Sequence, residues 1–403
     1  MNPLPSTIHD STSLVEPAVP SRARGSRAVE LALVAFFLAV LPSALLIQTA
    51  VELHQRQGVG ALDVFRQKPT SANLRAYEHG LEEASVIART ARPAFQFAQF
   101  AWLRDGGQKT LLGRDGWLFY RPGYDAMLAG TPSRTAAADD PVAAIVAWRD
   151  ALAARGIHLL VVPAPNKESV YPDRLTRRVA DGHGIISPVT RDVLIRLQSA
   201  GVECVDLFDA FAQARANAVA GDGPLYLAQD SHWSPAGIAL AARHVAQRLV
   251  EKGWVQAGAT AYVERPVEVQ RSGDVLRMMQ SPRLERCFPP EAVSCVQVVR
   301  SETAEPYNDD VNSGILVLGD SFLRIYETDE PGACGFIAHM ARELRQPLAS
   351  IVNDGGASTL VRQDLSRRPA WLANKKVVVW EFVERDLLLG TEGWQRVPLP
   401  PKK

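Results

Sequence analysis

The sequence predicts an α/β fold in which a parallel sheet carries helices on both faces. Short apolar runs with β character alternate with segments of helical apolar spacing over residues 139–251 and again over 315–388. The runs at 158–162 (HLLVV) and 315–318 (ILVL) are almost continuously apolar, as in strands buried on both faces. Polar or glycine-containing loops follow both runs, and in such folds ligands bind at the carboxyl edge of the sheet.

The bulk composition does not identify a partner, but it gives no support to a nucleic-acid partner. The 403 residues suffice for one large domain or two smaller ones. Lys plus Arg equals 44 and Asp plus Glu equals 44, so net charge provides no reason to expect a nucleic-acid partner. We therefore predict no nucleic-acid binding.

The N-terminal region predicts a membrane anchor. Residues 1–27 are rich in Pro and Ser and should form a disordered cytoplasmic tail. Residues 31–47 (LALVAFFLAVLPSALLI) contain no charge, and a transmembrane helix over 28–51 is long enough to cross the hydrocarbon core. A cleaved signal peptide is the competing interpretation. Because Arg22, Arg24 and Arg27 precede the apolar run, the positive-inside rule places everything after it outside the cytoplasm.

A helical stalk or linker is expected over 52–107, before a catalytic domain over 108–403. The helical pattern at 72–103 contains Pro93, where a break is predicted. Asp115-Gly116 lies between two apolar runs and is typical of a hairpin turn. A hairpin over 111–120 would therefore open the catalytic domain.

The alternating elements of this domain follow in order. Helices are expected over 139–154, 185–199, 207–217, 234–251, 334–344 and 358–365. Strands are expected over 158–162, 202–207, 225–227, 315–318, 348–352 and 377–382. Residues 258–312 differ, because alternating stretches there predict a mostly β insertion. This insertion contains Cys287 and Cys295, which would form a disulfide in an oxidising compartment or else remain free thiols.

Ser321 is the candidate nucleophile, because Gly319-Asp320-Ser321 ends the buried run at 315–318. A serine nucleophile needs a base and a group that orients the base. Asp230 and His232 lie two residues apart after a short apolar run and before a predicted helix. One loop could therefore supply both groups, with Asp230 bonded to one ring nitrogen and the other nitrogen facing Ser321.

Other interpretations of these residues remain open. Gly-Asp-Ser is a common turn sequence, Asp230 could cap a helix, and His232 could be a structural histidine. His183, in a glycine-flanked loop, is the one rival base. Asp230 and His232 could also bind a metal, but no third ligand is evident, and we predict neither a metal nor a cofactor.

Several residues are candidates for stabilising the oxyanion or contacting substrate. The backbone N–H of Ser321 lies at a predicted helix start, and Asn353 or Gly355 could provide a second donor. Trp233 adjoins the proposed base, and it belongs to a set of aromatic residues that could line a sugar-binding cleft: Trp117, Tyr120, Tyr124, Trp233 and Trp380. Lys167 and Arg385 could contact an anionic substrate, or they could be ordinary surface cations.

The combined motifs resemble a known family. Residues 229–234 (QDSHWS) followed by 315–322 (ILVLGDSF) resemble the periplasmic SGNH-hydrolase-like proteins of alginate and exopolysaccharide O-acetylation. Residues 113–119 (GRDGWLF) and 161–167 (VVPAPNK) add to the resemblance, which covers about 111–388. Ordinary SGNH esterases have the serine block first and an Asp-x-x-His block last, whereas here the order is reversed and the spacing is Asp-x-His.

The resemblance implies an SGNH-hydrolase-like fold and a Ser-His-Asp O-acetyltransferase. The protein would be a single-pass protein of the bacterial inner membrane with its catalytic domain in the periplasm. A membrane-bound O-acyltransferase partner would supply the acetyl group, Ser321 would carry it, and a polysaccharide hydroxyl would accept it. Two alternatives remain: a carbohydrate acetylesterase with the same triad, and a non-catalytic polysaccharide-binding scaffold.

Overall fold

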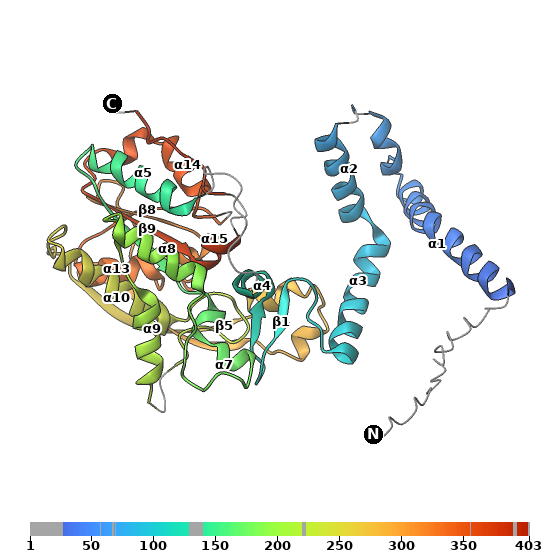
Figure 1. Cartoon of the computed structure of the whole chain (residues 1–403), viewed down its shortest axis with the longest axis horizontal. Helices are drawn as coiled ribbons and strands as arrows, with labels where there is room; N and C mark the ends of the chain where they lie inside the picture. The colour runs from blue at the N-terminus through green and yellow to red at the C-terminus, as the bar shows by residue number, and fades with distance from the viewer. Residues whose placement is uncertain are drawn as a thin grey trace, which may run out of the picture. The chain divides into compact units, whose positions relative to one another are not determined.

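The computed structural model describes residues 27–56, 58–66, 68, 70–128, 140–219, 223–354, 356–389 and 393–401 (Figure 1). The chain divides into two compact units, 1–91 and 92–403. The second unit begins before residue 108, the predicted start of the catalytic domain. The predicted tail at 1–27 lies, except for Arg27, outside the described residues.

The first unit is helical. Helix α1 (Arg27–His54) includes the stretch Val29–His54, which is long and apolar enough to cross a membrane and is a candidate anchor. It is followed by η1 (Gly60–Arg66) and α2 (Ser71–Ala84). The predicted break at Pro93 is wrong, because Pro93 lies inside α3 (Val86–Ala98). The helix begins after Ser85, whose hydroxyl accepts a hydrogen bond from the Ala88 N–H at 3.2 Å as an N-cap does.

A five-stranded parallel sheet forms the centre of the second unit, as predicted. Its order is β4-β3-β9-β7-β8, with every pair parallel. The strands are β3 (His158–Ala164), β4 (Glu203–Cys204), β7 (Ile315–Gly319), β8 (Ala349–Val352) and β9 (Val377–Val383). Strand β7 lies between β9 and β8. The carboxyl end of β7 therefore has a strand on either side of it at the carboxyl edge of the sheet.

Alternate side chains of these strands enter two separate cores. Ile315 and Val317 pack in one core, whereas Leu316 and Leu318 pack in the other. This period of two is the geometry of a strand buried on both faces. The resulting apolar burial fixes the register of β7 and therefore the position of Ser321.

Helices cover both faces. Helices α9 (Leu207–Ala216), α10 (Pro235–Glu251) and α13 (Phe336–Leu344) contribute to the first core. Helices α5 (Pro141–Ala153), α8 (Pro188–Ser199) and α14 (Leu360–Ser366) contribute to the second. Figure 1 shows α5 and α14 on one side of β8 and β9, with α10 and α13 on the other. Shorter helices complete the unit: α4 (Arg121–Leu128), α6 (Lys167–Val170), α7 (Pro172–Leu175), α11 (Asp274–Met278), α12 (Ser321–Arg324), α15 (Glu384–Leu389), η2 (Gln99–Leu103), η4 (Leu284–Arg286) and η5 (Pro369–Leu372).

Two antiparallel hairpins accompany the sheet. β1 (Thr110–Leu112) pairs with β2 (Leu118–Tyr120) across Asp115 and Gly116, which both have positive φ, as the turn prediction requires. The 258–312 insertion is built on β5 (Tyr262–Arg271) and β6 (Glu291–Arg300), which pair along their whole length. The expected strand at 225–227 is wrong, because only Tyr226 forms a bridge there, to Trp233.

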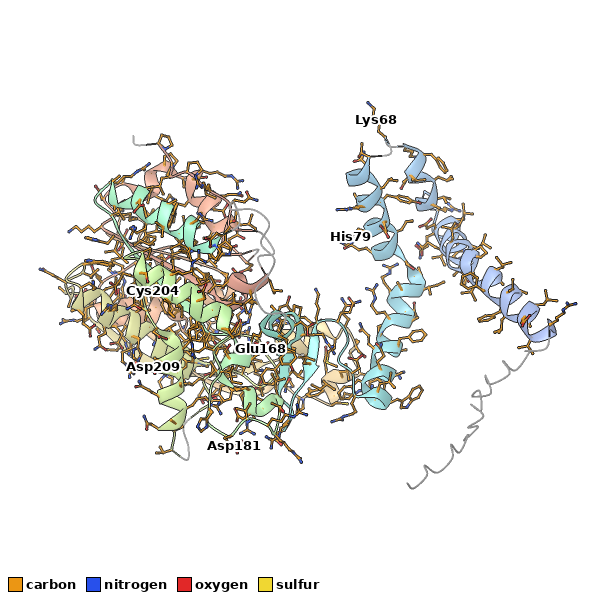
Figure 2. All side chains as sticks on the ribbon, viewed as in Figure 1. Lys68, His79, Glu168, Asp181, Cys204 and Asp209 are labelled. Atoms are coloured by element: carbon orange, nitrogen blue, oxygen red, sulfur yellow. The ribbon has the colours of Figure 1, made fainter. Side chains whose placement is uncertain are left out.

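Of the two alternatives for Cys287 and Cys295, a disulfide or free thiols, the structure has free thiols. Cys287 is exposed and Cys295 is buried, and all four cysteines are free. Cys204, labelled in Figure 2, lies in β4, where burial raises the pKa of its thiol to about 12.

Candidate active site

Strand β7 delivers Ser321 to the carboxyl edge of the sheet. Asp320 caps the following short helix, α12, because its side chain accepts a hydrogen bond from the Phe322 N–H at 2.9 Å. Phe322 and Leu323 are buried, whereas Ser321 is only half-buried. The turn therefore anchors its two apolar residues in the core and leaves the hydroxyl accessible.

Gly319 is needed in this tight turn because Glu381 and Leu323 lie too close to leave room for a Cβ, not because its φ is unusual. A Cβ at this position would lie 2.4 Å from Glu381 Oε2 and 2.5 Å from Leu323 Cδ1. Glu381 lies on β9 directly beneath the turn and accepts a hydrogen bond from the Asp320 N–H at 3.3 Å. Burial and the neighbouring Asp320 raise the pKa of the Glu381 carboxyl well above its usual value.

The loop before α10 supplies His232 and Asp230. Ser234 caps α10 by accepting a hydrogen bond from the Gly237 N–H, and Pro235 occupies the first helical position. Trp233, which lies between His232 and Ser234 in the sequence, donates its indole N–H to the Phe322 carbonyl oxygen at 3.0 Å. This bond joins the histidine loop directly to the serine turn.

The three predicted residues form a continuous hydrogen-bond relay. His232 Nε2 lies 2.8 Å from Ser321 Oγ, and His232 Nδ1 lies 2.6 Å from Asp230 Oδ1. Asp230 is fully buried and His232 nearly so, which leaves Ser321 as the accessible member. This is the geometry in which a carboxylate fixes the imidazole tautomer and the imidazole removes the serine proton.

The electrostatics match these roles. Burial opposes ionisation of Asp230, but His232 and Arg271 outweigh it and hold the pKa of the carboxyl well below its usual range. Burial also disfavours the imidazolium of His232, yet the Asp230 carboxylate outweighs it and raises the pKa of the ring. Asp230 therefore remains charged, and His232 has increased affinity for the proton that it would take from Ser321.

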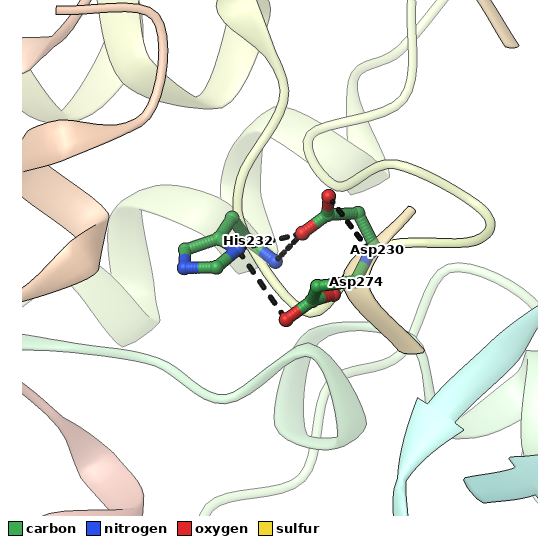
Figure 3. A group of neighbouring side chains, drawn as sticks. All are labelled: Asp230, His232 and Asp274. Atoms are coloured by element: carbon green, nitrogen blue, oxygen red, sulfur yellow. Dashed lines mark hydrogen bonds and ion pairs between the residues drawn. The ribbon is translucent and has the colours of Figure 1, made fainter. Parts of the chain in front are cut away.

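The insertion completes the site with two residues that sequence reasoning missed. Arg271, at the end of β5, donates from Nε to Asp230 Oδ2 at 3.0 Å. Asp274 donates its backbone N–H to the same oxygen at 3.2 Å, and its carboxylate accepts hydrogen bonds from the N–H and hydroxyl of Ser231. Figure 3 shows Asp230 and Asp274 both facing the His232 ring, and Asp274 Oδ2 lies 3.7 Å from Nδ1.

Gly273 is the local signal that could have revealed this contact. A Cβ at Gly273 would lie 1.9 Å from the Gln229 carbonyl oxygen and 2.6 Å from the Asp230 nitrogen. Its φ of −66° is ordinary, so the glycine is required for space. Because Gly273 has no side chain, the chain can pass close to the Asp230 loop, and both Arg271 and Asp274 can reach Asp230.

Asp274 also supplies the third ligand that a metal site at Asp230 and His232 would need. Potential ligand atoms of these three residues lie within 4.8 Å of one another. However, Asp230 Oδ2 already faces the guanidinium of Arg271, and the Asp274 carboxylate is engaged by Ser231. A cation would have to displace these donors next to a fixed positive charge, so the donor set fits a hydrogen-bonded triad better than a metal.

Two predicted substrate contacts are instead structural. Lys167 is buried and donates to the carbonyl oxygens of Leu118 at 2.5 Å, Ala228 at 2.8 Å and Asp230 at 3.0 Å. Burial lowers its pKa to about 8. Trp233 is completely buried and stacks on Phe336 with ring centroids 5.7 Å apart. Neither side chain can reach a substrate, and both hold the Asp230/His232 loop in place.

Arg385 lies beside the serine turn. Its guanidinium lies 5.5 Å from the ring centroids of both Phe322 and Tyr120. Burial raises the pKa of the Asp320 carboxyl, and the positive charge of Arg385 opposes this rise; the same charge opposes the rise in the pKa of His232 that Asp230 causes. Arg385 is partly exposed, so it remains a candidate for contact with substrate.

The other candidates have different positions. Asn353 donates from Nδ2 to Asp364 at 2.6 Å, and its backbone N–H donates to the Gly319 carbonyl oxygen at 3.0 Å. Gly355 lies outside the described residues. The rival base His183 is exposed, and Nδ1 lies 3.2 Å from the Asp181 carbonyl oxygen in its own loop. Of the remaining aromatic residues, Trp117 and Trp380 are buried, whereas Tyr120 and Tyr124 are partly exposed.

Comparisons with known proteins agree with this architecture. Residues 110–384 match the family described as SGNH hydrolase-like domain, acetyltransferase AlgX. The chain is 22% identical over 325 residues to the probable alginate O-acetylase AlgJ of Pseudomonas aeruginosa, covering 79% of this chain and 80% of that protein. It is 23% identical over 326 residues to the protein of the same name from Azotobacter vinelandii, covering 77% and 78% respectively.

Solved structures share the fold. The O-acetyltransferase domain of Pseudomonas putida AlgJ superposes with a TM-score of 0.53 at 23% identity, covering 70% of this chain and 93% of that one. Pseudomonas aeruginosa AlgX superposes with a TM-score of 0.50 at 18% identity, covering 70% and 64% respectively. These structures support the α/β architecture described above.

Proposed function

Because the chain belongs to the family of SGNH hydrolase-like AlgX acetyltransferase domains, we propose that it is an O-acetyltransferase that modifies an extracytoplasmic polysaccharide through an acetyl-serine at Ser321. The relatives' names specify alginate. For this chain the proposed acceptor is a hydroxyl of an alginate-like or other exopolysaccharide.

The hydrogen-bond relay from Asp230 through His232 to Ser321 carries the proposal. Its two bonds, 2.6 Å and 2.8 Å long, end on the one accessible member of the three. A structural histidine would satisfy its second ring nitrogen with a buried partner rather than with a half-exposed hydroxyl at the carboxyl edge of a parallel sheet. This argument favours an enzyme over a binding scaffold.

In the first half-reaction Ser321 is acetylated. Ser321 Oγ attacks the carbonyl carbon of the acetyl donor while its proton moves to His232 Nε2. The tetrahedral intermediate places negative charge on the carbonyl oxygen, and the Ser321 backbone N–H at the start of α12 is one candidate donor to it. Collapse breaks the bond to the leaving group, which takes the proton from His232, and leaves acetyl-Ser321.

In the second half-reaction a sugar hydroxyl attacks acetyl-Ser321. His232 Nε2 removes the proton of that hydroxyl, the ester bond to Ser321 breaks, and Ser321 Oγ regains a proton from His232. Asp230 keeps Nδ1 protonated and stabilises the imidazolium in both halves. Arg385 is the proposed contact for an anionic group of the acceptor, because its charge lies next to the serine turn.

The proposed location is the periplasmic face of the bacterial inner membrane. Val29–His54 would span the membrane once, with Arg22, Arg24 and Arg27 on the cytoplasmic side. The proposed donor partner is a membrane-bound O-acyltransferase, as the family resemblance implies. Anchoring would keep Ser321 near that donor and raise its effective concentration.

The test uses the full chain in detergent or in lipid nanodiscs with a chromogenic acetyl ester. We expect release of the chromophore and a covalent acetyl group on Ser321 in the intact-protein mass. Ser321→Ala should abolish both, whereas Ser301→Ala, which changes an exposed serine, should leave them unchanged. Turnover that survives in Ser321→Ala would refute the nucleophile.

A second arm separates transfer from hydrolysis. Oligosaccharides with and without uronate carboxylates are added as acceptors, and their masses are measured. We expect acetylated oligosaccharide to accumulate and free acetate to fall. Release of acetate at an unchanged rate, without acetylated sugar from any acceptor, would indicate an esterase instead.

A further inference from the structure

Cys295 shares its buried surroundings with Cys334 rather than with Cys287, which lies closer to it in the sequence. Cys295 lies in β6 opposite Val267, and Cys334 lies immediately before Gly335 and helix α13. Both thiols are almost completely buried in the first core, and their mutual hydrogen bonding lowers the pKa of Cys295 and raises that of Cys334. Cys287 is exposed, and its sulfur lies 3.9 Å from the Arg283 carbonyl oxygen.

Hydrogen bonds close to the two cysteines join β6 to the segment that precedes α13. The Val298 N–H donates to the Ala333 carbonyl oxygen at 2.9 Å, and Gln297 Nε2 donates to the Gly332 carbonyl oxygen at 2.9 Å. The Cys334 N–H donates to the Tyr326 carbonyl oxygen at 2.8 Å. These bonds hold the segment before α13 against β6 independently of the thiols, so two buried cysteines lie on neighbouring segments.

We propose that Cys295 and Cys334 form a disulfide in the exported protein, which ties the β5–β6 hairpin to the segment that follows Ser321. Cys204 and Cys287 remain thiols. The inference depends on the proposed extracytoplasmic location only for the oxidant, since disulfides persist in oxidising compartments. It does not depend on the catalytic roles of Ser321, His232 and Asp230.

The reaction is a two-step exchange with the disulfide of an oxidised dithiol oxidoreductase. The thiolate of one cysteine attacks a sulfur of that disulfide and forms a mixed disulfide, releasing one oxidoreductase thiolate. The second cysteine thiolate then attacks the mixed disulfide, which forms the Cys295–Cys334 bond and releases the reduced oxidoreductase. Two protons leave the cysteines and two electrons reduce the oxidoreductase. Because both thiols are buried in the folded domain, the exchange takes place while it folds.

The bond would constrain the surroundings of Asp230. Arg271 lies in the same hairpin as Cys295, and its guanidinium lies 3.8 Å from Asp329, in the segment between Ser321 and Cys334. Arg271 also lies over the ring of Tyr326, 5.1 Å from its centroid. The disulfide therefore joins the two segments that position Arg271 against Asp230.

Peptide mapping of the full exported chain tests the inference. The protein is unfolded without reductant, alkylated, digested and analysed by mass spectrometry. We expect alkylation at Cys204 and Cys287, and one linked species containing Cys295 and Cys334 that is lighter than its two peptides by two hydrogen atoms. Ser321→Ala, which lacks the proposed nucleophile, should give the same map, so failure of the proposed function and failure of this inference are distinguishable.

Thermal denaturation provides an independent measurement. Reductant should lower the melting temperature of the wild type and of Cys287→Ala, but not that of the double variant Cys295→Ala/Cys334→Ala. Alkylation of all four cysteines, or a bond between Cys287 and Cys295, would overturn the inference. Should the double variant not fold, the wild-type map still decides the outcome.

Discussion

Arg271→Met is the change that most directly tests whether the insertion belongs to the catalytic machinery. The Asp230 carboxylate accepts four hydrogen bonds: from the His232 ring at 2.6 Å, the His232 N–H at 3.1 Å, the Asp274 N–H at 3.2 Å and Arg271 Nε at 3.0 Å. Arg271 is the only charged donor of the four when His232 is neutral. Methionine keeps much of the apolar volume but removes that donor and its charge.

The magnitude follows from the burial of this bond. A hydrogen bond to a charged group contributes about 1.5–3 kcal/mol. The Arg271 side chain is 14% exposed, so water can replace part of it, and we take a value of about 2 kcal/mol in the lower half of that range. If losing this bond leaves the Asp230 carboxylate, and with it the His232 ring, misplaced at the transition state by the same free energy, kcat/KM should decrease about 30-fold.

The pH dependence adds a readout that a general structural defect would not reproduce. Catalysis needs neutral His232, so activity is lost as the pH falls through the pKa of the ring. Removing the positive charge of Arg271 strengthens the effect of Asp230 on His232 and raises that pKa further. The acidic limb of kcat/KM for acetyl-ester cleavage should therefore move to higher pH in Arg271→Met.

Two variants control for charge and for unrelated damage. Arg271→Lys retains a cation beside Asp230, so it should lose less activity and show a smaller movement of the acidic limb. Arg277→Met removes an exposed arginine from the same insertion and should behave as the wild type. If Arg271→Met cleaves the ester within twofold of the wild-type rate with an unmoved acidic limb, Arg271 does not position Asp230.

Four further predictions follow from the packing and the ionisation states. Gly319→Ala should reduce kcat/KM by about 100-fold or more, because its Cβ would meet Glu381 and Leu323 and displace Ser321. Glu381→Gln should retain activity within twofold, because burial raises the pKa of the carboxyl well above its usual value and an amide oxygen can still accept the Asp320 N–H. Because the pKa of Glu381 is higher in the folded than in the unfolded state, its contribution to stability is complete below the unfolded-state pKa and is lost as the pH rises through the folded-state pKa. The unfolding free energy of Glu381→Gln, measured by denaturant titration, should therefore depend less on pH than that of the wild type. The wild-type acidic limb should lie above the pH at which an ordinary imidazole titrates, because Asp230 raises the pKa of His232. Loss of the proposed Cys295–Cys334 bond, which closes a loop of roughly 40 residues, should lower the unfolding free energy by about 4 kcal/mol, measurable by denaturant titration of Cys334→Ala.

The sheet could be predicted because its signal is local. Strands buried on both faces need continuous apolar runs, and residues 158–162, 315–318 and 377–382 provide them. The expected strand at 225–227 failed because three apolar residues can be buried without a neighbouring strand. Tyr226 illustrates this, since it is completely buried yet forms only a bridge to Trp233.

The relay could be predicted because each of its members belongs to a recognisable sequence motif. The residues that hold the relay in place, such as Arg271, belong to no such motif. Arg271 ends a strand whose side chains are mostly exposed or half-exposed, and nothing in its neighbours distinguishes it from Arg265 or Arg277. For Lys167 the sequence was misleading, because a lysine in a polar loop is usually a surface cation. In the structure its ammonium group is buried and donates to three carbonyl oxygens. Long-range contacts decided both cases.

The Asp-x-His spacing explains why these supports are needed. With only Ser231 between them, Asp230 must turn its carboxylate back toward His232, and Oδ1 then accepts both the ring and the backbone N–H of the histidine. Oδ2 is left facing away from the loop, and a buried carboxylate oxygen without donors would be costly. The loop itself offers no further donor to Oδ2, so donors must come from another segment, and Arg271 and Asp274 provide them. On this argument the 258–312 insertion is a required part of the site, and a chain with this spacing but without such donors should hold Asp230 less firmly ionised and His232 less firmly oriented.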